Sequence, residues 1–317
     1  MKQLPSKSVR TIVTSPPYNL RNSTGGGMHN ASGGKWSKAK LLQGYETDSG
    51  SENYGDDLPH HEYVYWQRQC LREMMRILRP DGAIFYNHKW RVQAGRWQDR
   101  ADIVDDLPLP VRQIIIWARK GGINFNPGYF LPSYEVIYLF AGPKFKLEPK
   151  ANAQTDVWDI TQDMTNPHPA SFPEEMVRRC VKSVGEGVIL DPFMGSGTTA
   201  IIAEEEDRPW IGIEISPKYV AMSEQRISER RAETLIEKKI EAIRDEIKRQ
   251  EKLRSEAALL SLSVKKDGNF FDASFNLLLK SDMKTLRPQY TAEAQKKSSF
   301  IWLILKASKL LKMKDSG

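Results

Sequence analysis

The segment from residue 187 to residue 214 constrains the fold most strongly. Two apolar runs, Gly187–Asp191 and Trp210–Glu214, each end in a carboxylate and flank a glycine-rich turn and a helix-forming stretch, Thr198–Glu206. This order of strand, turn, helix and strand is typical of an open, mostly parallel sheet, which binds ligands at the carboxyl ends of its strands. We therefore expect an α/β fold, and 317 residues suffice for one large domain or two small ones.

Other apolar runs extend this sheet and cover it with helices. Clusters of β-branched and aromatic residues predict strands at Val9–Thr14, Ala83–Tyr86, Gln113–Trp117 and Glu135–Phe140. Apolar residues at helical spacing predict helices at His61–Leu78, at Phe172–Val184 and from 218 to about 260. The turn Arg79–Gly82 is expected to end the first helix, and Pro173 fits the first turn of the second.

Charge divides the chain into two parts. Residues 231–317 hold 19 Lys and Arg against 12 Asp and Glu, so they carry the whole net charge of +7, and residues 1–230 are balanced. We expect a folded domain over residues 1–230 and a basic, helical extension over residues 231–317. A stripe on this extension, made of Ile236, Ile240, Ile243 and Ile247, indicates either pairing in a homodimer or a helix docked by one face.

Several classes of protein are excluded by what the sequence lacks. No long apolar run is present, and Met1–Pro5 lacks the hydrophobic stretch of a secretory signal, so we expect a cytoplasmic protein without membrane contacts. Cys70 and Cys180 are too few for a disulfide framework and belong to no zinc-binding pattern. We expect no metal site, and both cysteines are expected in the core.

The first chemical motif is the turn Asp191-Pro192-Phe193-Met194-Gly195-Ser196-Gly197-Thr198-Thr199. Its glycines let the backbone approach a ligand, and Asp191 places a negative charge at the end of a strand. That charge repels a phosphate and attracts a cofactor with ammonium or sulfonium groups, such as S-adenosylmethionine. Glu214, at the end of the next strand, suits a carboxylate that accepts hydrogen bonds from ribose hydroxyls. A tight turn in an ordinary α/β protein is the alternative.

The second chemical motif is Thr14-Ser15-Pro16-Pro17-Tyr18. The exocyclic amino group of cytosine or adenine is a poor nucleophile, because its lone pair is delocalised into the ring. We expect Ser15 Oγ and the Pro16 carbonyl to accept its two hydrogens, held in place by the restricted φ angles of the prolines. Tyr18 would stack on a base taken out of the duplex. Alone, such a tetrapeptide is also a common turn.

The two motifs together, in this order, resemble the DNA amino-methyltransferases of the β class, which modify cytosine N4 or adenine N6. Four further segments are similar to motifs of that family: Leu78–Phe85, Ile115–Trp117, Tyr134–Ile137 and His168–Pro173. The likeness spans about Leu4 to Arg226. It implies a Rossmann-like S-adenosylmethionine-dependent methyltransferase fold with a circularly permuted motif order, base flipping and direct methyl transfer to double-stranded DNA.

The resemblance also assigns roles to residues and partners. It makes Ser15, Pro16, Pro17 and Tyr18 catalytic. It assigns the cofactor to seven residues: Asp191, Phe193, Gly195, Ser196, Gly197, Thr198 and Glu214. A serine before the two prolines is more typical of cytosine-N4 enzymes and favours that base over adenine N6. A prokaryotic or phage-encoded protein with a cognate restriction endonuclease is implied.

One departure from the family keeps alternatives open. Family members usually carry a short strand with a Gly-Asp pair before the segment equivalent to Lys2–Pro5, and it helps to form the pocket for the adenine of the cofactor. Because this chain starts after that point, a DNA-binding homologue with impaired catalysis is one alternative. Methylation of a protein or RNA amide is disfavoured, because enzymes of that kind resemble Asn-Pro-Pro-Tyr and place the cofactor motif first.

DNA recognition is assigned to two loop regions, about 19–60 and 88–130. In the first, Arg21, Lys35 and Lys38 are expected to contact DNA. In the second, Arg91, Arg96 and Arg100 form another basic set.

Overall fold

The computed structural model describes residues 1–19, 58–93, 96–119, 127–163 and 171–266. Contacts divide the chain into two units, Met1–Glu237 and Lys238–Gly317. The described helices are α2 (His60–Ile77), α3 (Ala101–Val104), the 3-10 turn η2 (Ala151–Ala153), α4 (Glu174–Lys182), α5 (Thr198–Glu205) and α6 (Pro217–Lys266). The described strands are β1 (Val9–Thr14), β2 (Leu78–His88), β3 (Arg91–Gln93), β4 (Arg96–Gln98), β5 (Val111–Ala118), β6 (Tyr134–Ala141), β7 (Val157–Asp159), β8 (Ile189–Asp191) and β9 (Trp210–Gly212).

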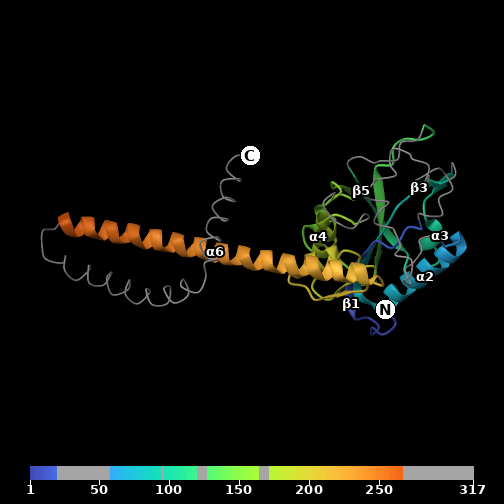
Figure 1. The fold of residues 1–317 in the computed structure, drawn as a ribbon, viewed down its shortest axis with the longest axis horizontal. Helices are drawn as coiled ribbons and strands as arrows, with labels where there is room; N and C mark the ends of the chain where they lie inside the picture. Colours follow the sequence, from blue (N-terminus) through green and yellow to red (C-terminus); the bar gives the residue numbers. More distant parts are fainter. Residues whose placement is uncertain (20–57, 94–95, 120–126, 164–170, 267–317) are drawn as a thin grey trace. The chain divides into compact units, whose positions relative to one another are not determined.

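A seven-stranded sheet in the order β7-β5-β6-β2-β1-β8-β9 forms the centre of the first unit (Figure 1). β1 pairs in parallel with β2 on one side and β8 on the other, and the pairs β8–β9 and β5–β7 are also parallel. Strand β6 runs antiparallel to both β2 and β5. The sheet is therefore mostly parallel, as predicted. From β1 the chain continues to β2 on one side, whereas β8 and β9, which come last in the sequence, extend the sheet on the other side. Open sheets bind ligands at such a switch point.

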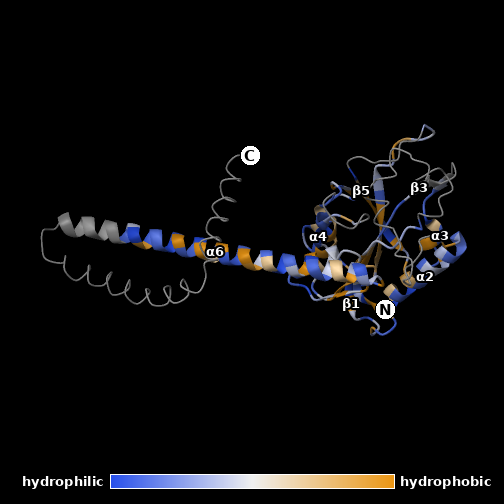
Figure 2. Cartoon of the chain, viewed as in Figure 1, coloured by the Kyte–Doolittle hydropathy of each residue, from blue (hydrophilic) through white to orange (hydrophobic). Residues whose placement is uncertain are grey.

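Helices cover both faces of this sheet. On one face, Met176 and Val177 of α4 and Ile202 of α5 pack in one buried cluster with alternate strand residues such as Phe85 and Leu139. On the other face, Leu71 and Met74 of α2 pack with the intervening strand residues, such as Ile84 and Phe140. Figure 2 shows hydrophobic residues concentrated in the strands. Burial on both faces explains why these strands read as continuous apolar runs.

The predicted turn at Arg79–Gly82 is wrong, because these residues lie within β2. Val9 pairs with Leu78 and Thr11 pairs with Ala83, so the segment between them is a bulge opposite Arg10. A Cβ at Gly82 would lie 2.5 Å from the Arg10 carbonyl oxygen, and only a glycine allows that approach. Helix α2 therefore ends at Ile77, and the strand begins with no loop between them.

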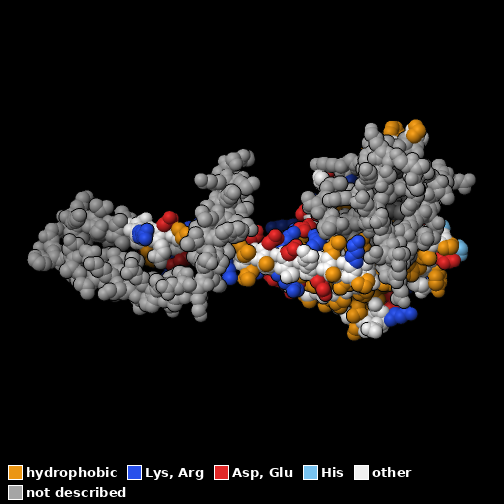
Figure 3. Space-filling model, in the orientation of Figure 1, with side chains coloured by type: hydrophobic (Ala, Val, Ile, Leu, Met, Phe, Trp, Pro, Cys, Tyr) orange, Lys and Arg blue, Asp and Glu red, His pale blue; other side chains and the backbone are white. Residues whose placement is uncertain are grey.

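Helix α6 continues through the predicted domain boundary at residue 230. Acidic, basic and hydrophobic side chains are mixed along it (Figure 3). Ile236, Ile243 and Ile247 are about half exposed, and the homodimer expected from this stripe stays a prediction. Within residues 1–19, 58–93, 96–119, 127–163 and 171–266, no helix is both long and apolar enough to cross a membrane.

Candidate active site

The structure brings the two sequence motifs together at one edge of the sheet. Strands β1 and β8 are parallel neighbours, with Thr11 opposite Ile189 and Ile12 opposite Leu190, so their carboxyl ends lie side by side. Thr14 Oγ1 donates a hydrogen bond of 2.8 Å to Asp191 Oδ1 across that boundary. We call residues 15–18 the proline corner and residues 191–198 the glycine corner. The two are joined although 177 residues separate Thr14 from Asp191.

The proline corner is held by hydroxyl contacts that run into the protein. Ser15 Oγ lies 2.7 Å from Tyr18 Oη, and Tyr18 Oη donates a hydrogen bond of 3.0 Å to Glu135 Oε2. Asn87 Nδ2 donates to both of these acceptors, at 2.8 Å to Tyr18 Oη and 2.9 Å to Glu135 Oε2. Burial, followed by the negative charge of Glu135, raises the pKa of Tyr18 well above its ordinary value. The phenol therefore stays protonated.

Glu135 is a buried carboxylate with a largely buried cation beside it. The residue is 6% exposed, and its Oε1 forms an ion pair of 3.2 Å with Arg119 Nη1. Glu135 is the second residue of β6 and lies opposite Trp117 of β5. Arg119 directly follows the last residue of β5. A buried charge is costly unless it is paired and hydrogen-bonded, and Glu135 satisfies both conditions.

A second set of contacts orients the backbone of the proline corner. Tyr63 Oη of α2 donates a hydrogen bond of 2.8 Å to the Pro17 carbonyl and lies 2.7 Å from His88 Nε2. The His88 ring lies 4.8 Å from the Tyr18 ring, tilted by 32°. One side of the Tyr18 ring is thus in contact with His88, and Tyr18 is only 9% exposed, so stacking on a base needs the opposite side of the ring.

The glycine corner is held by backbone N–H groups and one buried acid. Asp191, 2% exposed, accepts hydrogen bonds from Thr199 Oγ1 at 2.7 Å and from the Phe193 N–H at 3.1 Å, as well as from Thr14. Burial raises the pKa of Asp191 to about 6. Gly195 and Gly197 have φ values of 52° and 81°, which favour glycine.

Glu214 joins the glycine corner to the start of α6. Its Oε2 accepts the Gly195 N–H at 2.8 Å, and its Oε1 accepts the N–H groups of Ile215 at 3.0 Å and Ser216 at 2.9 Å. The apolar run predicted that Glu214 is the last residue of a strand. Strand β9 ends at Gly212, so Glu214 lies two residues beyond it. The carboxylate still lies beside the turn.

The charge of the glycine corner fits a cationic cofactor. Within the part of the chain that the structure describes, neither Asp191 nor Glu214 forms an ion pair, and the charge of Glu214 contributes to the raised pKa of Asp191. Two acids without a cation leave a negative potential, which favours ammonium and sulfonium groups over phosphates. The left-handed backbone at Gly195 and Gly197 keeps side chains out of the turn. These observations fit S-adenosylmethionine.

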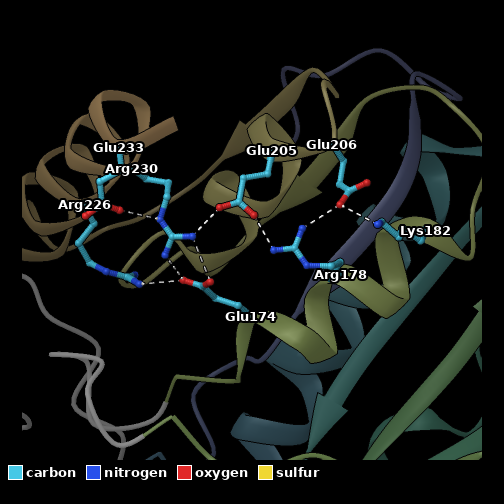
Figure 4. Close-up of polar contacts among 8 residues, drawn as sticks. All are labelled: Glu174, Arg178, Lys182, Glu205, Glu206, Arg226, Arg230 and Glu233. Carbon is cyan, nitrogen blue, oxygen red and sulfur yellow. Dashed lines mark hydrogen bonds and ion pairs between the residues drawn. The ribbon is translucent and has the colours of Figure 1, made fainter. Parts of the chain in front are cut away.

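Helix α6 packs directly under the glycine corner. Arg226 Nη1 donates a hydrogen bond to the Ser196 carbonyl, and a Cβ at Gly197 would lie 2.9 Å from Ser223 Cβ. An ion-pair network ties this part of α6 to α4 and α5. Figure 4 shows its members: Glu174, Arg178, Lys182, Glu205, Glu206, Arg226, Arg230 and Glu233. The network fixes the helix that supports the turn.

Several residues of this site were not found from sequence. Glu135, Asn87, Arg119 and Tyr63 surround the proline corner, and Trp66 of α2 packs edge-on against Phe193 at 5.7 Å. The available signal was Glu135, a charged residue at the start of an otherwise apolar strand. Cys180 is fully buried as predicted, whereas Cys70 is only partly buried.

Only some of the residues predicted to contact DNA lie within the described residues. Arg21, Lys35 and Lys38 lie outside the described residues, as does most of the loop at about 19–60. The second basic set is wrong at Arg100, which is 2% exposed and precedes α3 in a left-handed conformation.

Among the described residues, no three His, Cys, Asp or Glu side chains are grouped as metal ligands.

Comparisons with known proteins agree with this geometry. The Type II methyltransferase M.BglII of Bacillus subtilis is 26% identical over 71% of this chain and 65% of its own length, so the chain spans just under two thirds of that relative. The cytosine-N4-specific PvuII DNA methyltransferase has a TM-score of 0.51 at 18% identity, over 72% of this chain and 86% of that one. A Thermus thermophilus protein solved with S-adenosyl-L-methionine has a TM-score of 0.50 at 23% identity, over 72% and 89%.

The sheet and its two neighbouring corners define a Rossmann-like methyltransferase fold, which the likeness to these structures supports. The model of the N6/N4 DNA methylase family matches residues 9–225, and the chain belongs to this family.

Proposed function

We propose that the chain transfers a methyl group from S-adenosylmethionine to the exocyclic amino group of a base flipped out of double-stranded DNA, with cytosine N4 as the favoured acceptor. The observation that carries this proposal is the hydrogen bond between Thr14 and Asp191, which joins the proline corner to the glycine corner. Adenine N6 methylation by the same residues is the alternative. The serine at position 15 favours cytosine, since that residue is more typical of cytosine-N4 enzymes.

Each corner has its own task in this reaction. Asp191, Phe193, Gly195, Ser196, Gly197, Thr198 and Glu214 would hold the cofactor, which supplies an electrophilic methyl group when it is bound. Glu214 accepts N–H groups here and, at the edge of the turn, suits ribose hydroxyls. Ser15 Oγ and the Pro16 carbonyl would accept the hydrogens of the amino group and localise its lone pair. The nitrogen itself is the nucleophile, so no covalent enzyme intermediate is needed.

The test is methyl transfer in vitro. Tritium from labelled cofactor should be incorporated into duplex DNA by the wild-type chain, and Ser15→Ala should lower the rate about 100-fold or more. Digestion of the product and mass spectrometry of the nucleosides should give N4-methylcytosine. Incorporation into adenine would select the alternative, whereas DNA binding without incorporation or cofactor binding would favour the catalytically impaired homologue.

Partners and location remain predictions alongside this function. Double-stranded DNA is the proposed substrate, and a cognate restriction endonuclease and a homodimer stay predicted partners. A cytoplasmic location in a prokaryote or a phage-infected cell fits a reaction on DNA.

A further inference from the structure

The described part of the chain contains one buried acid that the proposed reaction does not yet use. Glu135 lies 3.0 Å from Tyr18 Oη, and Tyr18 Oη lies 2.7 Å from Ser15 Oγ. Three oxygens thus form a line from the proposed acceptor of the substrate amine to a carboxylate in the protein interior. The ion pair between Arg119 and Glu135 does not by itself indicate a catalytic role, because buried ion pairs also occur in purely structural settings. The direction of the hydrogen bonds therefore decides whether these three oxygens can pass a proton.

Chemistry fixes the direction of every hydrogen bond in this line. Glu135 Oε2 can only accept, so Asn87 Nδ2 must face it, and the single proton of Tyr18 must also point to it. Tyr18 Oη then accepts from Asn87 Nδ2 at 2.8 Å and has no proton left for Ser15. Ser15 must therefore donate its own proton to Tyr18, which leaves the lone pairs of Ser15 Oγ free to accept a hydrogen from a base.

We propose that Glu135 is a positioning residue that holds the Ser15 hydroxyl in this acceptor orientation and receives, through Ser15 and Tyr18, the proton that the substrate amine loses. The proposal rests on the proposed function and adds the destination of the proton. Arg119 balances the charge of the buried carboxylate before the reaction, and Asn87 holds the carboxylate and phenol in register.

The proton balance closes without any further reactant. As the nitrogen gains its bond to the methyl carbon, the bond from that carbon to the sulfonium sulfur breaks and its electron pair stays on the sulfur, so the positive charge passes to the nitrogen. One N–H bond of the amine then breaks. That proton binds Ser15 Oγ, the Ser15 proton moves to Tyr18 Oη, and the Tyr18 proton moves to Glu135 Oε2. One N–H bond is replaced by one O–H bond on Glu135, and the positive charge of the amine cancels the negative charge of the carboxylate. The neutral acid later returns its proton to solvent. The high pKa of Tyr18 makes the phenol a conduit rather than a base.

The experiment measures single-turnover methyl transfer to duplex DNA by the wild type, Glu135→Gln, Glu135→Asp and Tyr18→Phe. We expect Glu135→Gln and Tyr18→Phe each to slow transfer about 100-fold, and the double variant to be no slower than either, because both changes break one relay. Glu135→Asp keeps the carboxylate and should recover part of the rate. The dissociation constants for cofactor and DNA should stay at their wild-type values, since Glu135 is only 6% exposed and its oxygens are engaged by Tyr18, Asn87 and Arg119.

Tyr86→Phe is the matched control. Tyr86 is fully buried on β2, and its hydroxyl donates at 2.8 Å to Oε1 of Gln67, which is not a member of the relay. This variant should lose folding stability and keep the transfer rate. As a readout apart from turnover, the carbon-13 signal of the hydroxyl-bearing ring carbon of Tyr18 should shift in Glu135→Gln and stay unchanged in Tyr86→Phe.

The outcomes separate the two proposals. A wild type that transfers no methyl group overturns the proposed function and the relay with it. A wild type that transfers, together with Glu135→Gln at the wild-type rate, overturns only the relay. Additive losses in the double variant also overturn it, because they would mean that the two residues act independently. If Glu135→Gln does not fold, Tyr18→Phe against Tyr86→Phe decides the matter.

Discussion

The two corners of the site lie at the same sheet edge but are built by different means. The proline corner is held by side chains from three strands or their ends, in the order Ser15, Tyr18, Asn87 and Glu135. The glycine corner is held mainly by backbone N–H groups that point to two carboxylates, Asp191 and Glu214. The first is a line of protons with a defined direction, and the second is a shaped backbone with a negative charge.

This difference matches what each corner is proposed to bind. A poorly nucleophilic amine needs acceptors in fixed positions and a place for its proton, and the hydroxyls and the carboxylate of this corner can supply both. A cofactor that carries positive charge and a ribose needs close backbone approach and acids nearby. Changes at the glycine corner should therefore alter stability and cofactor binding, whereas changes at the proline corner should alter the rate of transfer.

The largest expected effect is the pH dependence that Asp191 imposes on stability. Its pKa is about 6 in the folded chain against 3.8 for the ordinary group, so the folded state holds this proton more tightly than the unfolded state. The stability gained from protonation of Asp191 is fully present below pH 4 and is lost as the pH rises through 6. The free energy of unfolding should fall by about 3 kcal/mol over that window relative to Asp191→Asn, in which the side chain does not titrate.

Urea unfolding of the wild type and of Asp191→Asn from pH 4 to pH 7 measures this difference. The contributions of the other acids are the same in both proteins and cancel. The amide of Asn can still donate to Thr199 Oγ1 and accept from Thr14, so the variant should fold. A difference that stays constant across the window would show that burial does not shift this carboxyl.

Gly197→Ala should cost about 2 kcal/mol and weaken cofactor binding about tenfold or more. The residue has φ of 81°, where an L side chain is strained, and the new Cβ would meet Ser223 Cβ at 2.9 Å. Calorimetry with S-adenosylmethionine and thermal unfolding check both effects. Adding Ser223→Gly should recover the share due to the contact and leave the share due to φ; full recovery would contradict the strain.

How far the sequence predicted this site follows from the range of the interactions. Local patterns located the apolar strands and both corners, and the parallel order of β1 and β8 then placed the corners together. The pairing of Tyr18 with Glu135 depends on the register of β2, β6 and β5, which no local pattern encodes across 117 residues. The bulge at Arg79–Gly82 was missed because Pro and Gly mark a turn and a bulge alike.

Tyr63→Phe should have a smaller effect, about 1 kcal/mol of stability and a several-fold loss of transfer rate. The change removes the hydrogen bond to the Pro17 carbonyl and the contact with His88, which leaves the proline corner less firmly oriented. Tyr65→Phe is the matched control, because Tyr65 lies on the same helix and is 65% exposed. Equal rates in the two variants would mean that α2 does not orient the corner.

The smallest expected effect concerns the ion pairs under the glycine corner. Glu205 bridges Arg178 of α4 and Arg230 of α6, and all three side chains are partly buried. Glu205→Gln should cost about 1 kcal/mol of stability, because partly buried networks are worth more than single exposed pairs. Glu233 also pairs with Arg230, but its side chain is 68% exposed, so Glu233→Gln should be close to neutral. Thermal unfolding at low and high salt compares them. Cofactor binding and the transfer rate at saturating cofactor then test the comparison between the corners. If Glu205→Gln weakens cofactor binding and keeps the wild-type rate at saturation, α6 supports the glycine corner alone. If the rate at saturation also falls, the two corners are not independent.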